Sequence, residues 1–246
     1  PVGEGDRPKG GGGVSPPVAT PLRQPFRAAT SPSRGGSYGP PRLPPPAALP
    51  TLRGMADFFD ALTDAHVAMI GRQPVFFVAT AAAEGRINLS PKGYDAFRVL
   101  SPRRVAWLDL GGSGNETNAH LIEDGRITIM FCNFEQPALI LRIYGRGRPV
   151  LPWERDWEEL AARFTLLPGT RQIFDIEVES VQTSCGYGVP LMQLERERPT
   201  LLKAHAKADP AIWAGRARNA RASIDGLPVR TTDRYIAGAP GTVPED

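Results

Sequence analysis

Residues 74 to 148 alternate short apolar segments with polar links, and this alternation constrains the fold more than any other feature of the chain. Apolar runs of roughly four to eight residues that are rich in β-branched and aromatic side chains indicate strands. Turn dipeptides, among them Glu84-Gly85 and Ser101-Pro102, separate these runs. The pattern therefore predicts strands in VFFVATA, RINLS, AFRVL, RRVAWLDL, RITIMFCNF and ALILRIYGRGRPVL.

The segments around these strands complete the outline of a small barrel. RQIFDIEVESVQT alternates apolar and polar residues, which predicts one more, half-buried strand. Helical spacing of apolar residues predicts helices over 57–72, 116–123 and 153–164, with one or two more after residue 196. Antiparallel strands with marginal helices favour a barrel, because closure removes the exposed edges that a flat sheet must protect. The stripe expected on the 153–164 helix consists of Trp153, Trp157, Leu160 and Phe164.

The first 54 residues differ from the rest in composition. They hold 13 of the 26 prolines and the glycine run from Gly10 to Gly13. Such a segment cannot bury enough apolar surface to offset its ordering entropy, so it is predicted to be disordered. We expect residues 1–54, which precede the first methionine, Met55, to be an added extension rather than a functional arm. We expect one folded domain over 55–246.

Charge and cysteine content narrow the class of protein. The net charge is +3, but the first 54 residues carry +5 and the remainder carries −2, which disfavours nucleic-acid binding by the folded domain. Neither a secretory signal nor an apolar run near the ~20 residues of a membrane span is found. Cys132 and Cys185 are far apart and neither belongs to a CxxC pair. This argues against structural zinc or a disulfide framework, and favours a cytoplasmic protein.

Two polar links form the candidate site. They are Ser90-Pro91-Lys92-Gly93 and the run GGSGNETNAH over 111–120. Hydroxyls, amides and one cation beside the exposed N–H groups of a helix start are what a phosphate needs. No GxGxxG follows a strand and opens a helix, and no GxSxG is present, so dinucleotide-binding and hydrolase readings fail. For His120 an ordinary helix histidine is favoured over a catalytic base.

The ordered set of segments resembles one known family. FFVATA, GRINLSPKGYD, VAWLDLGGSGNETNAHL, GRITIMF and ILRIYGRGRPV closely resemble, over about residues 56 to 190, the flavin-binding split-barrel family named after pyridoxamine 5′-phosphate oxidase. VQTSCGYGVP and NARASIDGLP resemble a branch whose substrates are mostly unassigned. The resemblance implies a mainly β (α+β) fold, a six-stranded antiparallel split β-barrel with peripheral helices. It also implies a homodimer with FMN bound at the interface.

The resemblance further implies a set of cofactor-binding residues on the RINLSPK strand. Arg86 and Lys92 occupy the places of the basic residues that hold the cofactor, with Ser90 donating beside Lys92 and Asn88 facing the ring system. The alternative for Lys92 is a solvated turn lysine.

A second part of the site departs from the family pattern. The positions of a phosphate-gripping Arg-Lys pair are Thr117-Asn118 here, which removes two cations. The phosphate is then expected to rely on Lys92, Arg86 and Arg142, together with N–H groups and the hydroxyl of Thr117, and Asn115 and Asn118 are further cofactor-binding candidates. Asp109 either accepts from a flavin N–H or caps its loop, and both roles stay open. Arg142 points away from its apolar neighbours, and contact with the cofactor is slightly favoured.

The function predicted from the sequence is FMN-dependent oxidation or reduction of an unidentified small molecule. No catalytic acid or base can be named, and the C-terminal RYIAGAPGTVPED lacks the Arg-and-Trp segment of the vitamin-salvage oxidases. Two alternatives remain, a deazaflavin-dependent reductase on the same barrel and a non-enzymatic flavin-binding or heme-binding protein. No activating group lies near Cys185 in sequence, which favours an inert thiol, and Tyr187 either covers the flavin or packs.

Overall fold

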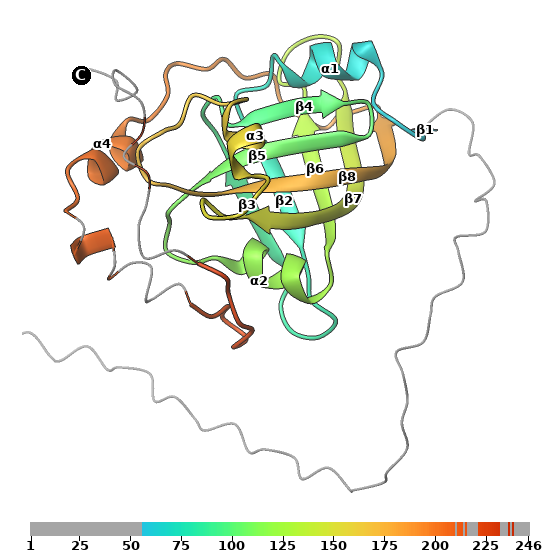
Figure 1. The fold of residues 1–246 in the computed structure, drawn as a ribbon. Helices are drawn as coiled ribbons and strands as arrows, with labels where there is room; N and C mark the ends of the chain where they lie inside the picture. The colour runs from blue at the N-terminus through green and yellow to red at the C-terminus, as the bar shows by residue number, and fades with distance from the viewer. Residues whose placement is uncertain are drawn as a thin grey trace, which may run out of the picture. The chain divides into compact units, whose positions relative to one another are not determined.

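One antiparallel sheet of eight strands organises the part of the chain that the structure describes (Figure 1). This structure is a computed structural model, and it describes residues 56–209, 211–213, 215, 221–231, 236 and 238. The predicted disordered segment 1–54 and most of the residues after 231 lie outside this range. Disorder in the N-terminal segment therefore stays a prediction.

The strands follow the predicted segments closely, and neighbouring strands are antiparallel throughout. The order across the sheet is β3-β2-β6-β7-β8-β5-β4, and β1 pairs with β8. The fold class is confirmed as an antiparallel split barrel with peripheral helices, although the described sheet has eight strands rather than six. The strands are β1 (Ala56–Phe59), β2 (Phe76–Thr80), β3 (Asn88–Lys92), β4 (Phe97–Ser101), β5 (Arg104–Leu110), β6 (Arg126–Cys132), β7 (Ile140–Val150) and β8 (Thr170–Ser184).

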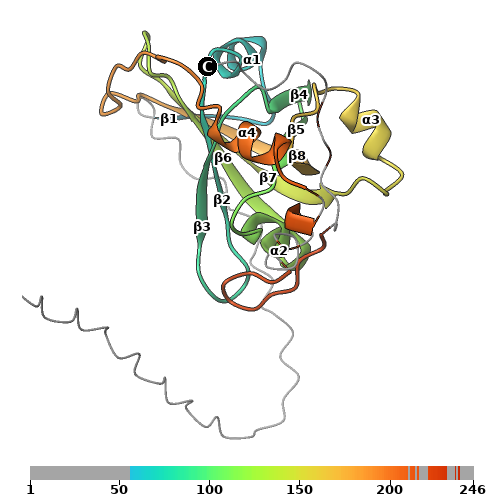
Figure 2. The same cartoon turned by 90° about the vertical axis from the view of Figure 1, so that its left-hand side faces the viewer.

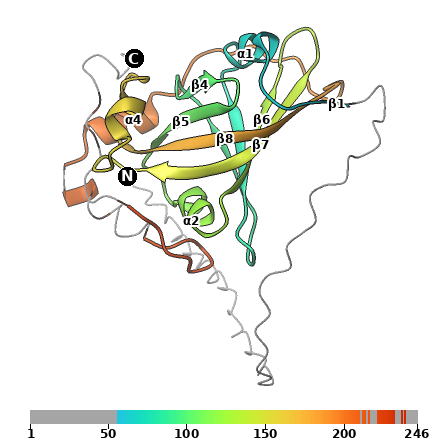
Figure 3. The ribbon, with the colours of Figure 1, turned by 45° about the vertical axis from the view of Figure 1, so that its right-hand side comes forward.

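Short helices lie at the margins of the barrel in the described part of the chain. They are α1 (Asp64–Ile70), α2 (Glu116–Glu123), α3 (Trp157–Ala161) and α4 (Thr200–Ala206). Helices α1 and α2 lie at opposite ends of the sheet in two views (Figures 1 and 3). Helix α2 has the bounds expected from the sequence and directly follows the glycine-rich link.

The predicted helix over 57–72 is wrong in its first half. Residues 56–59 form β1, which pairs with the end of β8, and the helix begins only after Thr63. The Thr63 hydroxyl accepts from the backbone N–H of His66, and the His66 side chain accepts from the Thr63 N–H, which fixes the start of α1. The apolar residues before this cap suit a strand as well as a helix, so pairing with β8 decides.

The predicted 153–164 helix is also shorter in the structure. Trp157, Leu160 and Phe164 are buried as expected, but Trp153 is 59% exposed and lies before α3. Strand β8 is more buried than predicted, because residues 170–174 are covered on both faces. A second core cluster around α3 covers this part of β8.

The larger core cluster fills the barrel between β2, β5, β6, β7 and β8. Trp107 of β5 stacks on Phe174 of β8 with ring centroids 4.5 Å apart, and both are almost completely buried. Each such side chain contributes about 1.5–3 kcal/mol through burial. The core therefore makes the barrel a rigid support for the polar ends of its strands.

Candidate functional site

Strand β3 presents three polar side chains to the interior of the barrel. Asn88, Ser90 and Lys92 alternate with the exposed residues Leu89 and Pro91, so the two sets point to opposite faces. Ser90 lies opposite a fully buried valine of β2, and the same cross-strand row continues through fully buried residues of β6, β7 and β8. The three predicted cofactor residues of this strand therefore share one face.

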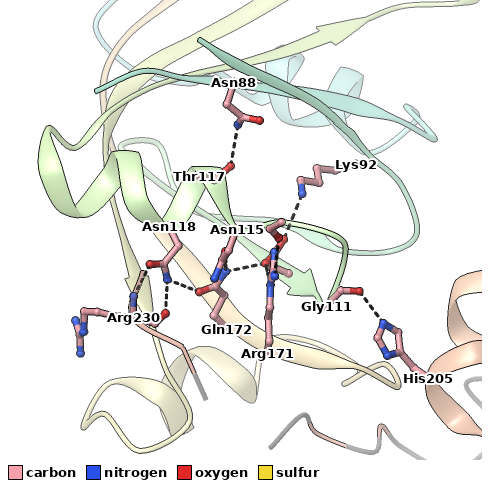
Figure 4. A network of polar contacts seen from close by, with 12 residues as sticks. Asn88, Lys92, Gly111, Asn115, Thr117, Asn118, Arg171, Gln172, His205 and Arg230 are labelled. Carbon is pink, nitrogen blue, oxygen red and sulfur yellow. Dashed lines mark hydrogen bonds and ion pairs between the residues drawn. The ribbon is translucent and has the colours of Figure 1, made fainter. Parts of the chain in front are cut away.

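A buried carboxylate on β5 lies at the centre of a polar network (Figure 4). Lys92 Nζ lies 3.3 Å from Asp109 Oδ1. The Oδ2 atom of Asp109 accepts from Arg171 Nε at 2.6 Å and from Gln172 Nε2 at 2.7 Å. Both carboxylate oxygens of Asp109 are thus engaged by β3 and β8, and acceptance from a flavin N–H stays a prediction.

Opposite charge keeps this carboxylate ionised. Burial by itself would raise the pKa of Asp109, but the charges of Arg171 and Lys92, with hydrogen bonds from Gln172 and Arg171, hold it below its ordinary value of 3.8. With two cations and one anion, the cluster of Lys92, Arg171 and Asp109 carries a formal charge of +1. The site therefore favours an anionic ligand.

The glycine-rich loop between β5 and α2 is held by residues that sequence reasoning missed. Arg171 Nη1 donates to the Gly114 carbonyl at 2.8 Å, and His205 Nε2 of α4 lies 2.7 Å from the Gly111 carbonyl (Figure 4). Arg171 and Gln172 do leave a sequence signal, since they are consecutive polar residues at the start of a strand that otherwise mostly alternates apolar and polar residues. Nothing local in the sequence points from His205 to the loop.

The start of α2 brings more of the predicted residues to β3. Asn115 occupies the N-cap position without a capping bond, because its Oδ1 accepts from Gln172 Nε2 at 2.8 Å instead. Asn88 Nδ2 donates to Thr117 Oγ1 and to Thr80 Oγ1, each at 3.1 Å. Asn115 therefore belongs to the network around Asp109 through Gln172, whereas Asn88 and Thr117 form a second group of hydrogen bonds between β3 and α2.

Two side chains of α2, those of His120 and Asn118, form hydrogen bonds within the chain. His120 is buried, and its Nδ1 lies 3.1 Å from Thr80 Oγ1, in keeping with an ordinary helix histidine. Asn118 Nδ2 donates to Gln172 Oε1 at 2.6 Å and to the Arg230 carbonyl at 2.8 Å. Its Oδ1 accepts from the Arg230 N–H at 3.0 Å, so Asn118 anchors a distant segment.

The two remaining predicted residues lie away from this network. Arg86, just before β3, is exposed and pairs with Asp225. Arg142 of β7 points to the outer face of the sheet, opposite to its buried neighbours, and its Nη1 donates to Ser184 Oγ at 3.1 Å. The structure therefore does not bring Arg142 together with Lys92 in one chain.

Two buried polar atoms at the candidate site have no hydrogen-bond partner among the described residues. They are Ser90 Oγ and Asn115 Nδ2. A buried polar group left without a partner costs about 1–3 kcal/mol, so a ligand that forms hydrogen bonds with these atoms would be stabilised. A hydroxyl and an amide beside a lysine fit the phosphate and the ring carbonyls of a flavin nucleotide.

Other classes of site find no support in the described part of the chain. No group of three or more His, Cys, Asp or Glu side chains there is arranged to hold a metal ion. None of the described helices has the length and apolar character needed to cross a bilayer. Cys132 is buried, which raises the pKa of its thiol, while Cys185 and Tyr187 are exposed.

The strand topology and the polar network at the β3–α2 junction define an antiparallel split barrel with a candidate anion site. Residues 62–185 match the sequence pattern described as pyridoxamine 5′-phosphate oxidase, and the chain belongs to this family.

Individual relatives are consistent with this membership. The pyridoxamine 5′-phosphate oxidase family protein ustO of Aspergillus flavus is 42% identical over 146 residues, which cover 57% of this chain and 58% of that protein. The chain therefore spans less than two thirds of the curated relative that it matches.

Solved structures show weaker likeness. HupZ of Group A Streptococcus is 22% identical with a TM-score of 0.41, over 49% of this chain and 91% of that chain. An FMN-binding protein of Syntrophomonas wolfei is 12% identical with a TM-score of 0.37, over 52% and 84% of the two chains. The fold assignment therefore rests on the strand topology and the family match.

Proposed function

We propose that this protein binds FMN and uses it to oxidise or reduce a small molecule. The observation that carries the proposal is a pair of unpartnered buried atoms. They are Ser90 Oγ, two residues before Lys92 on β3, and Asn115 Nδ2, whose side chain shares the Gln172 amide with Asp109. Family membership supports a flavin as the ligand. When bound, FMN supplies hydride transfer at its ring, which is chemistry that the protein has only to position.

The chain's own residues would hold and orient this cofactor. Lys92 supplies a partly exposed cation, and Ser90 and Asn115 supply hydrogen-bond capacity that the protein leaves unused. Asp109, Arg171 and Gln172 act on the cofactor only through Lys92 and the glycine-rich loop, which they fix in place. A rigid network of this kind lowers the entropy cost of ligand orientation.

A homodimer is part of the proposal. The outer face of the sheet carries Arg142 and the exposed apolar residues Phe58 and Leu89, which belong to one face by register. A second copy covering this face would bury the apolar residues. It would also bring Arg142 toward the partner's cofactor, in keeping with the expectation from the sequence that Arg142 contacts the cofactor.

The proposal is tested by flavin binding. We expect Lys92→Ala to lower FMN affinity at least about tenfold, the loss of a charge-assisted contact. Lys207→Ala, which removes an exposed lysine after α4, is the matched control and should bind as the wild type does. Quenching of FMN fluorescence measures both constants, and a visible absorption spectrum identifies the bound pigment. Equal FMN affinity in the wild type and Lys92→Ala would refute the assignment of Lys92.

A further inference from the structure

The Asp225 carboxylate is bound by the backbone and side chain of Arg86, just before β3. The backbone N–H of Arg86 donates to Asp225 Oδ2 at 2.7 Å, and the Arg86 guanidinium pairs with Oδ1. His120 contributes a favourable charge interaction in the same direction. The backbone hydrogen bond from Arg86 is the largest cause that lowers the pKa of Asp225 below 3.8, so the Asp225 carboxylate bound there is ionised.

The backbone before Arg86 is shaped for this close approach. Gly85 has a φ of +101°, a backbone conformation that residues other than glycine rarely adopt. A Cβ atom at this position would lie 2.7 Å from Asp225 Oδ2, closer than real Cβ contacts allow. Glycine at the hairpin turn therefore lets the carboxylate reach the Arg86 N–H.

Asp225 is carried by residues 221–231, which we name the strap and which are drawn as a red-orange loop near α2 (Figure 2). Polar contacts hold the strap in place. The Ile224 N–H donates to both carboxylate oxygens of Glu116 at 3.1 Å, and the backbone of Arg230 bonds to Asn118. Ser223 is the only buried residue of the strap. A segment with so little apolar burial opens at low free-energy cost.

We propose that Asp225 is a specificity-determining residue, an internal anion that competes with the phosphate of a flavin nucleotide for Arg86. The proposal rests on the proposed function, because Arg86 and Asn118 are expected at the phosphate end of the cofactor. The strap occupies both of them. A carboxylate and a phosphate repel each other at one guanidinium, so phosphate binding displaces Asp225 and opens the strap.

The test compares two ligands that differ by the phosphate alone, FMN and riboflavin. Asp225→Asn keeps the size of the side chain and removes its charge, so competition predicts tighter FMN binding with unchanged riboflavin binding. We expect the ratio of FMN to riboflavin affinity to rise about fivefold, as for a partly exposed ion pair. Glu179→Gln is the matched control, because it removes a carboxylate from the exposed Arg146–Glu179 pair elsewhere.

Each outcome decides the question. A rise in the ratio confined to Asp225→Asn supports competition. An unchanged or lower ratio overturns it, and so does an equal rise in Glu179→Gln, which would trace the effect to net charge. Failure of both flavins to bind the wild type and Asp225→Asn would overturn the proposed function and the competition together, a result distinct from normal binding with an unchanged ratio.

Discussion

At the scale of single residues, the polar network depends on one buried negative charge. Asp109 accepts from β8 and faces Lys92 of β3, so it joins three strands that are distant in sequence. The free-energy cost of removing the Asp109 carboxylate from water is offset because two cations and a neutral amide surround it. Removing one partner from a buried charge cluster leaves the other charge uncompensated, which costs more than the pair itself contributes.

Asp109→Asn should therefore destabilise the protein by about 3 kcal/mol at neutral pH, because Arg171 loses its counter-charge. The folded-state pKa of Asp109 is below its unfolded value of 3.8, so the ionised form stabilises the fold above that pH. This contribution disappears as pH falls through the folded-state pKa, and the gap between wild type and variant should narrow below pH 3.8. Urea unfolding of both proteins at several pH values measures the gap.

The control for this experiment is Asp95→Asn, which removes an exposed carboxylate paired with Arg98. We expect a change of less than about 1 kcal/mol there. Equal stability of Asp109→Asn and the wild type at pH 7 would contradict the view that Asp109 holds the network together.

Sequence and structure agree about the face on which a site residue lies when strand periodicity alone determines that face. Asn88, Ser90 and Lys92 could be placed on one face because side chains alternate along a strand. The contact of Arg171 with Asp109 could not be predicted, since it depends on the pairing of strands in which the two residues are 62 positions apart in sequence. The partner of Arg86 lies still further away, 139 residues along the chain.

At the scale of secondary-structure elements, β7 and β8 approach each other unusually closely at one point. Their register shifts between Tyr144 and Gly145, which marks a β-bulge. A Cβ atom on Gly145 would lie 2.1 Å from the Glu177 carbonyl oxygen. Gly145 thus allows the two longest strands to stay paired through the bend.

Gly145→Ala should destabilise the protein by about 2–3 kcal/mol, because backbone atoms must move to relieve the overlap. Gly188→Ala is the matched control, since a Cβ atom there meets nothing within 4 Å. Thermal unfolding followed by circular dichroism compares the two variants with the wild type. If both variants melted at the wild-type temperature, the close approach of β7 and β8 would not require glycine at position 145.

The element-scale errors of prediction have the same origin as the missed contacts. Phe58 and Phe59 suit either a helix or a strand by local pattern, and only the pairing with β8 selects the strand. Trp153 matches the spacing of the helical stripe, but the helix begins at Trp157. The strands between β2 and β7 were predictable because turn residues bound each of them.

At the scale of the whole molecule, the sheet has one buried face and one face that is only partly covered. One outer row runs from Pro91 of β3 through Met130 and Arg142 to Gln182 and Phe58 of β1. None of these five residues is buried in the single chain. Antiparallel sheets can leave one face to water, and the exposed apolar residues on this face are the basis on which we propose it as the surface of association.

Leu89 provides the sharpest test of this surface, because it is 67% exposed and points away from the candidate site on the same strand. Leu89→Asp should convert a dimer into a monomer, since a charge buried without a partner opposes association. Trp153→Asp, which alters an exposed apolar residue beside α3, should leave the dimer intact. Light scattering after size-exclusion chromatography gives the mass of each. A monomeric wild type, or a Leu89→Asp variant that stays dimeric, would rule out this face as the interface, whereas loss of FMN binding together with the dimer would place the cofactor between two copies.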